Sequence, residues 1–245
     1  MRKLLRAAML LLAVLMAACT APDTWELVSK DNNIRFVLAN KKDKGEVNLC
    51  YSVYYRDTLA VEKSLLGLVM DNCEYGKDAQ FVSASAVKDI SNAYQLKSGK
   101  KLNTTDECRE QIFTFRNKEN KQFNLIARVY NDGVAFRYEL PGEAGQMHTI
   151  QTEHTEFAVP VNGKAWIHPY DWNDRHKPSY EQYCRSEIDI RSECGHGRGW
   201  AFPMLFNTNG IWMMITEAHL NGSYPATHID NALSLIHISE PTRPY

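Results

Sequence analysis

Short segments in which apolar and polar residues alternate run along most of the chain, separated by glycine, asparagine and charged turn residues. Because successive side chains of a strand point to opposite faces, this pattern predicts strands with one buried side. Amphipathic helices are scarce: residues 86–94 are the one fair short candidate, and they also fit a strand. The predicted strand segments are 34–40, 46–61, 65–70, 111–117, 122–140, 156–160, 164–170 and 210–218.

Two of these strand regions contain sequences typical of tight hairpins. Asn131-Asp132-Gly133 interrupts a β-rich run, and the sequence NTNG at 207–210 does the same. Asparagine and glycine accept the positive φ angles that hairpin turns require. Many short strands with frequent turns, and no repeat or low-complexity linker, predict an all-β fold, an antiparallel β-sandwich.

The first 19 residues have the character of a targeting segment. Arg2, Lys3 and Arg6 precede a short apolar run that ends in small residues before Cys19. The run is too short for a comfortable transmembrane helix, so it predicts export by a signal peptide. The junction resembles a bacterial lipobox, which predicts lipidation of Cys19; ordinary signal-peptide cleavage near Ala18 is the alternative.

Composition narrows the remaining possibilities. The 245 residues carry 28 lysines and arginines against 29 aspartates and glutamates, a formal net charge of −1. A balance so close to zero, without a basic run, argues against nucleic acid as a partner. The six cysteines form no C-x-x-C pair typical of zinc sites, and Cys50 is predicted to be a small buried residue.

The end of the chain differs from the rest. Residues 233–245, LSLIHISEPTRPY, lack periodicity continuous with the preceding strands. They look like a translated sequencing adapter, which predicts a non-native tail and a truncated protein; a genuine short strand and tail is the alternative. The expected organisation is therefore residues 1–19 as signal peptide, 20–232 as one β-sandwich domain and 233–245 as tail.

Several motifs in a fixed order carry a family resemblance. They are DNNIRFVL, SLLGLVM, ARVYNDGVAFRYELP, TEHTEFAVP, KAWI, SYEQY and MMITEAHLNGSYPATHI. In this order they resemble the N-terminal domain of glycoside hydrolase family 97, over about residues 24–230. The NDGVAFRYELP block is the most specific part. The resemblance implies a β-supersandwich of the galactose-mutarotase-like type, followed in complete members by a catalytic (β/α)₈ barrel that is missing here.

The same resemblance implies a calcium ion at the active site, held partly by barrel carboxylates and partly by one N-terminal glutamate. The matching residue is Glu181, and several hard oxygen ligands from different segments are what calcium prefers. Trp172, Tyr180 and Tyr183 are candidates for stacking on sugar rings, or for packing between domains. Glu217 is interpreted as a strand-end carboxylate with satisfied hydrogen bonds; a position facing the active site is the alternative. The histidines His168, His176, His196 and His219 lack the spacing of a metal-binding helix.

The implied function is that of the N-terminal domain of an exported glycosidase. The complete enzyme is expected to release terminal α-linked glucose or galactose from oligosaccharides in the periplasm or at the outer membrane of a Gram-negative bacterium. The membrane is a partner only through the lipid anchor. The catalytic carboxylates belong to the missing barrel, so the chain alone is expected to be inactive. The alternative is a stand-alone lipoprotein that binds carbohydrate without hydrolysing it.

Overall fold

The computed structural model describes residues 24–43, 45–71, 73–142, 149–170, 182–195, 199–220, 227–230 and 236–238, and every regular element in them is a β-strand. The strands of the first half are β1 Thr24–Val28, β2 Ile34–Asp43, β3 Glu46–Tyr55, β4 Thr58–Leu65, β5 Leu68–Met70, β6 Cys73–Tyr75, β7 Gln80–Ala84, β8 Lys88–Gln95 and β9 Asn103–Arg116. Those of the second half are β10 Gln122–Tyr130, β11 Val134–Glu139, β12 Ile150–Glu153, β13 Glu156–Phe157, β14 Lys164–Pro169, β15 Arg185–Asp189, β16 Trp200–Thr208, β17 Ile211–Ile215, β18 Ile229–Asp230 and β19 Ile236–Ile238.

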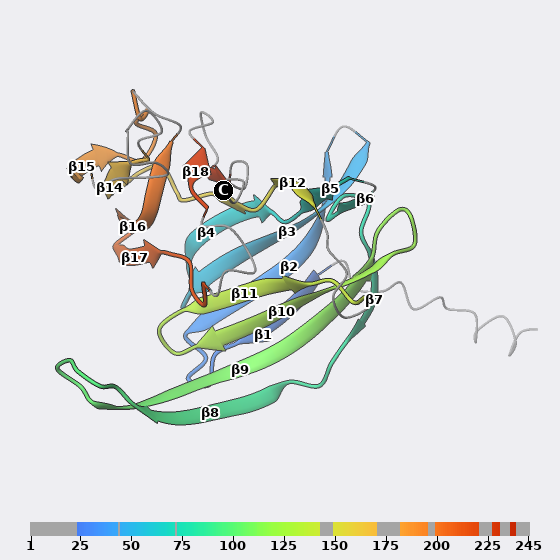
Figure 1. The fold of residues 1–245 in the computed structure, drawn as a ribbon, viewed down its shortest axis with the longest axis horizontal. Helices are drawn as coiled ribbons and strands as arrows, with labels where there is room; N and C mark the ends of the chain where they lie inside the picture. Colours follow the sequence, from blue (N-terminus) through green and yellow to red (C-terminus); the bar gives the residue numbers. More distant parts are fainter. Residues whose placement is uncertain are drawn as a thin grey trace, which may run out of the picture.

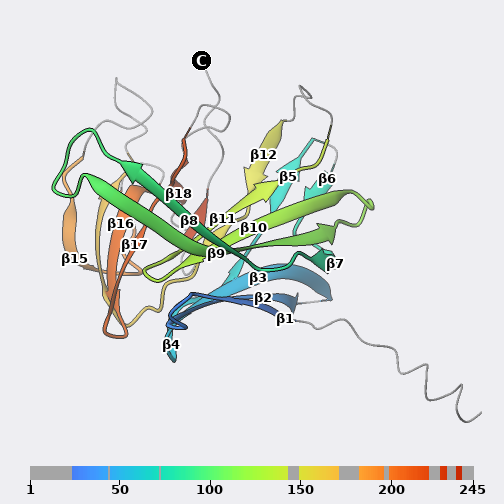
Figure 2. The same cartoon turned by 90° about the horizontal axis from the view of Figure 1, so that it is seen from below.

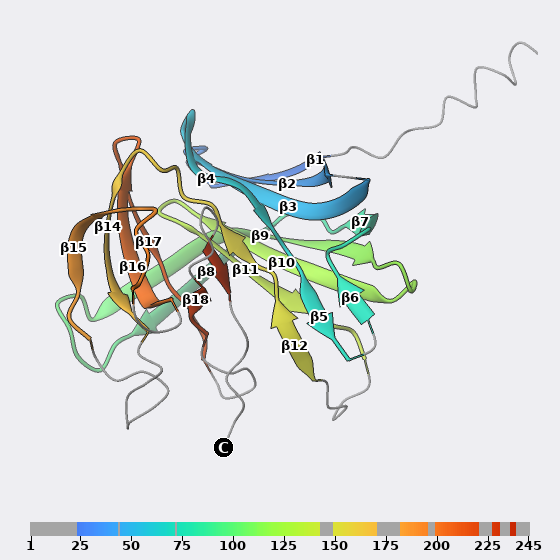
Figure 3. The same cartoon turned by 90° about the horizontal axis from the view of Figure 1, so that it is seen from above.

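These strands form four sheets, and all pairings between them are antiparallel. The first sheet has the order β1-β2-β3-β4, and the second has the order β11-β10-β9-β7 with β8 on β9. A small sheet, β12-β5-β6, lies beside them (Figure 1). The last sheet has the order β13-β19-β18-β16-β14-β15 with β17 on β16, and β14–β17 stand apart from the main sandwich (Figure 3). The predicted antiparallel β-sandwich is confirmed.

The main core lies between the first and second sheets, which face each other in Figure 2. Alternate residues of β2, Ile34, Phe36 and Leu38, point into it and are buried. Phe115 of β9 reaches across to Trp25 of β1, with ring centroids 5.5 Å apart in an edge-to-face arrangement. Such aromatic pairs stabilise the core beyond the burial of their surface alone. The alternation of apolar and polar residues in the sequence specifies which face of each strand enters this core.

A second, smaller core belongs to the last sheet. Its buried members include Ala165 and Ile167 of β14, Met204 and Phe206 of β16, and Ile229 of β18. Phe157 and Met213 pack against both cores and so connect them. The last sheet therefore shares its packing with the sandwich.

The segment with helical character is a strand. Residues 88–95 pair along their whole length with 103–110 of β9, so the helix alternative for 86–94 is wrong. The described pairings of β9 with β10 and β7 stop at Cys108. Before Cys108, β9 pairs with β8 alone, and these two strands extend as a two-stranded arm (Figures 1 and 2). Cross-strand pairing outweighs the weak local preference of this stretch for a helix.

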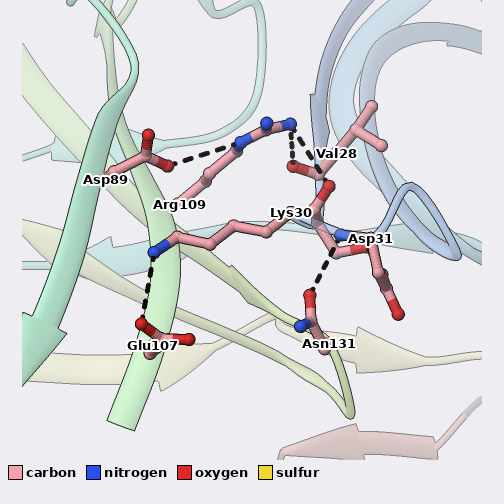
Figure 4. A network of polar contacts seen from close by, with 8 residues as sticks. Val28, Lys30, Asp31, Asp89, Glu107, Arg109 and Asn131 are labelled. Atoms are coloured by element: carbon pink, nitrogen blue, oxygen red, sulfur yellow. Dashed lines mark hydrogen bonds and ion pairs between the residues drawn. The ribbon is translucent and has the colours of Figure 1, made fainter.

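A polar network at the base of this arm connects β8 and β9 to the end of β1 (Figure 4). Arg109 of β9 donates hydrogen bonds to the carbonyl oxygens of Val28, at 3.4 Å, and Ser29, at 3.2 Å, and pairs with Asp89 of β8. Lys30 lies 3.9 Å from Glu107 on the same face of the arm. Exposed ion pairs contribute little energy, so the two carbonyl contacts carry most of the connection.

Both predicted hairpins are confirmed. The Tyr130 N–H donates to the Gly133 carbonyl at 2.8 Å, closing the β10–β11 turn. Asn209 and Gly210, with φ of 49° and 75°, join β16 to β17. By contrast, the predicted strand 46–61 is two strands, because Arg56, with φ of 54°, turns the chain between β3 and β4.

The described cysteines form no disulfide bonds with one another, and Cys50 is buried as predicted. Burial raises the pKa of the Cys50 thiol, as expected for a small core residue. Within the described ranges no helix is long and apolar enough to cross a membrane. The signal segment and Cys19 lie outside the described residues, as does most of 233–245, so export, lipidation and the tail stay predictions.

Candidate functional site

The segment predicted to carry the calcium ligand connects β14 to β15. β14 ends at Pro169 and is followed by Tyr170; the next described residue is Gln182, shortly before β15. The two strands are antiparallel neighbours, with Ile167 opposite Arg185. Glu181, Trp172 and Tyr180 lie outside the described residues, so their roles stay predictions, but the strand ends that hold their segment are defined.

Two buried rings mark the first of these ends. Tyr170 stacks flat on His228, with ring centroids 4.0 Å apart and planes 7° apart, and both residues are almost fully buried. The Tyr170 N–H donates to the Gly199 carbonyl oxygen at 2.8 Å. Because Trp200 pairs with both Pro169 and Ile229, the ends of β14, β16 and β18 meet here. Neither ring was singled out from the sequence; the only signal was their place at the ends of apolar strands.

Arg185 anchors the other end. Its guanidinium lies over the Trp200 ring, 5.3 Å from the centroid, an arrangement that favours a cation. It also donates hydrogen bonds to the carbonyl oxygens of Cys194, at 2.8 Å, and Glu193, at 3.4 Å. Arg185 thus links the start of β15 to the segment that follows it and to β16. The 171–181 connection is held between two packed strand ends.

Glu217 is a satisfied carboxylate, as interpreted from the sequence. Its Oε1 accepts hydrogen bonds from the Thr227 N–H at 3.1 Å and from the Thr227 hydroxyl at 2.6 Å. Thr227 immediately precedes His228, so this bond fixes the approach to the stacked rings. Glu217 therefore acts as a structural clamp beside the site.

Tyr183 is the one predicted sugar-stacking residue that the structure describes. Its side chain is 95% exposed, so its ring lies outside the packed cluster of Tyr170, His228 and Trp200. A ring so exposed is accessible to a ligand or to another domain. Its assignment to sugar binding stays a prediction.

The carboxylates, histidines and cysteines in the described ranges form no group of three that could hold a metal ion. Calcium in proteins takes six to eight oxygen ligands at most sites. What the described residues define here is the two packed strand ends, at Tyr170 and Arg185, on either side of residues 171–181.

Comparison with known proteins places the chain in context. The family model described as "Glycosyl-hydrolase 97 N-terminal" matches residues 27–242. A curated protein of Streptomyces bingchenggensis (strain BCW-1), named "Probable retaining alpha-galactosidase", is 27% identical over 169 residues, which are 69% of this chain and 25% of that protein.

Solved structures agree on the fold. A crystal structure of a beta-arabinopyranosidase matches with a TM-score of 0.79 at 25% identity, over 89% of this chain and 35% of that one. A glycoside hydrolase family 97 enzyme from Pseudoalteromonas sp. strain K8, solved with panose and with acarbose, matches with a TM-score of 0.73 at 21% identity. That match covers 88% of this chain and 32% of the enzyme. The chain thus spans about a quarter to a third of the length of the proteins it matches.

Proposed function

Because the chain belongs to the family of glycoside hydrolase 97 N-terminal domains, we propose that it is the first domain of an exported enzyme that cleaves terminal α-glucosyl or α-galactosyl residues. The family match over residues 27–242 carries this proposal. The named activity of the Streptomyces relative, an alpha-galactosidase, supports the substrate class. The oligosaccharides bound by the Pseudoalteromonas enzyme support a sugar-chain ligand.

The domain's own part is to support the catalytic barrel and to form one wall of the sugar pocket. The strand ends around Tyr170 and Arg185 support this role, because both are fixed by ring contacts and hydrogen bonds. A connection suspended between fixed ends loses less conformational entropy when it contacts another domain. Trp172, Tyr180 and Tyr183 would offer aromatic faces to the sugar.

Within that pocket, Glu181 donates one oxygen ligand to calcium in the complete enzyme. The described side chains offer no group of three carboxylates, histidines or cysteines for the ion, so we expect further ligands from the barrel that the family resemblance implies. A bound calcium would supply positive charge close to the reacting sugar. This chain contributes a single carboxylate to the calcium site, and the chain alone is inactive.

The test is to extend the gene at its source locus past the codon for Ala232 and to express the longer protein. We expect it to hydrolyse nitrophenyl α-galactoside or α-glucoside and to lose activity on chelation. Glu181→Gln should weaken calcium binding in calorimetry by more than about tenfold, because second-shell changes alone cost 10- to 100-fold. Glu187→Gln, at an exposed position of β15, is the matched control and should leave calcium affinity unchanged.

Two results would contradict the enzyme proposal. One is a longer protein without hydrolase activity, and the other is a stop codon shortly after Ala232 at the source locus. Binding of panose by the chain alone would then favour the carbohydrate-binding lipoprotein. Export and anchoring are tested separately: Cys19→Ala should release the protein from the membrane fraction and abolish labelling with a fatty-acid analogue.

A further inference from the structure

The two-stranded arm ends in a tip that combines exposed apolar side chains with lysines. Figure 1 shows this end of the arm, the loop between β8 and β9, extending beyond the main sandwich. Most side chains of β8 and of the first residues of β9 are exposed, so this part of the arm is open to solvent on both faces. We call residues 94–102 the arm tip.

One face of the arm tip is apolar. The Leu96 N–H donates to the Leu102 carbonyl oxygen at 2.7 Å, which places the two leucines opposite each other. Tyr94 is two positions before Leu96 on the extended chain and therefore shares their face. The side chains of Tyr94, Leu96 and Leu102 are 48%, 44% and 46% exposed. Gln95 and Asn103, paired between them, point to the opposite face, so the arm tip is amphipathic.

The loop that closes the arm tip is basic. Lys97, Lys100 and Lys101 surround the turn at Gly99, and all three lysines are exposed. Residues 90–105 contain these three lysines and no arginine, aspartate or glutamate, so the segment has a charge of +3 in a chain with a net charge of −1. The salt bridges between described residues involve none of the three. Their charges are therefore available to an anionic partner.

We propose that the arm tip docks on the surface of a bilayer that contains anionic lipids. The lysine loop meets the negatively charged head groups, and each lysine near such a surface strengthens binding by about fivefold. The two leucines and the ring of Tyr94 enter the boundary between head groups and acyl chains, while the charged and hydroxyl ends stay in water. A soluble polyanion fits less well, because it would pair with the lysines but leave the leucines in water.

This contact goes beyond the proposed function, because it needs neither hydrolase activity nor a lipid on Cys19. A single acyl chain holds a protein on a membrane only weakly, and a basic patch is one of the second signals that make anchoring stable. The base of the arm is fixed by the hydrogen bonds of Arg109 to the end of β1 (Figure 4). The arm tip is thus presented at a defined place on the domain.

The experiment follows the oxidation of Tyr94 by hydroxyl radicals in the full chain, because this signal reports on the arm tip alone. The probe is a vesicle of phosphatidylcholine with phosphatidylglycerol, and a vesicle of phosphatidylcholine is the comparison. We expect the anionic vesicles to slow oxidation of Tyr94 at least about threefold at low salt, and less at high salt, since salt screens the attraction. Trp212, 60% exposed on the last sheet, should be oxidised equally with and without vesicles.

Two variants separate the charged and apolar contributions. K97E with K100E and K101E reverses the charge of the loop and should raise the lipid concentration for half-protection of Tyr94 at least about tenfold. L96S with L102S should also raise it, but should keep the salt dependence, because the lysines remain. The altered side chains are exposed, so both variants should melt at the wild-type temperature, which shows that they fold.

The matched control changes the same charge elsewhere. Lys42, Lys63 and Lys118 are exposed lysines outside the arm. K42E with K63E and K118E alters the net charge as much as the loop variant does, and its half-protection of Tyr94 should stay close to that of the wild type.

Several results would overturn the proposal. Oxidation of Tyr94 that is unchanged by anionic vesicles is one, and equal protection by neutral vesicles is another. Equal half-protection in the loop variant and its matched control would exclude a role for the three lysines. Protection by soluble polyglutamate as strong as that by vesicles, and insensitive to L96S with L102S, would make the arm tip a polyanion site. None of these results bears on the proposed function, which the hydrolase assay tests separately.

Discussion

Replacing Tyr51 by phenylalanine should change how stability depends on pH. Tyr51 lies in the main core, 2% exposed, with its ring against Phe36 and Phe136. Its hydroxyl donates a hydrogen bond of 2.7 Å to the Glu156 carbonyl oxygen. Burial raises the pKa of Tyr51 well above its ordinary value of 10.0, and the nearby Tyr138 adds to this. The folded protein therefore keeps this hydroxyl protonated in alkaline solution.

The magnitude follows from two opposing effects. At pH 8 the variant lacks one buried hydrogen bond and should be less stable by about 1–2 kcal/mol. Above pH 10 the unfolded chain ionises Tyr51 while the folded chain does not, so the wild type loses stability as the pH rises. At pH 11 this loss is about 1.4 kcal/mol, and the variant does not suffer it. The difference between the two proteins should thus shrink almost to zero by pH 11.

Urea unfolding of both proteins, followed by tryptophan fluorescence at pH 8, 9, 10 and 11, measures this difference directly. Tyr94→Phe, which removes an exposed hydroxyl from β8, controls for the substitution itself. A free-energy difference between wild type and Tyr51→Phe that is constant from pH 8 to pH 11 would show that Tyr51 ionises in the folded state. The buried position assigned to its hydroxyl would then be wrong.

Three further predictions concern other parts of the fold. Gly163→Ala would place a Cβ 2.0 Å from the Asn207 carbonyl oxygen, so it should lower the free energy of unfolding by at least about 2 kcal/mol; wild-type stability in urea would contradict this packing. Tyr170→Leu removes the stack on His228 and should cost about 1–2 kcal/mol in the same assay, whereas Tyr170→Phe should retain most of that stability. The pKa of Asp31 is lowered, first by the Ser29 hydroxyl and then by Asn33, so its contribution is present above pH 3.8 and is lost as the pH falls below it. Asp31→Asn should therefore show a shallower loss of stability between pH 5 and pH 3 in thermal melts, and an unchanged slope would contradict this assignment.

The candidate site shows where inference from sequence stops. Glu181 was found through a family resemblance, because a glutamate in a polar loop has no pattern of its own. Tyr170 and His228 were not found, since they are 58 positions apart and only the pairing of β14, β16 and β18 brings them together. Glu217 was interpreted correctly as a satisfied carboxylate, although its partner, Thr227, could not be named.

Local chemistry by itself determined the all-β class and two of the turns. Period-two alternation predicted the strands, and Asn131-Asp132-Gly133 and the 207–210 turn predicted the hairpins, because positive φ angles and strand pleating depend on neighbouring residues only. Tertiary structure alone decided that 88–95 is a strand and that the last sheet has its own core. It also decided that Trp212 and Met214 of β17 point away from the core and are exposed. Those outcomes depend on partners distant in sequence, and the free energy of pairing and burial with such partners exceeds any local preference.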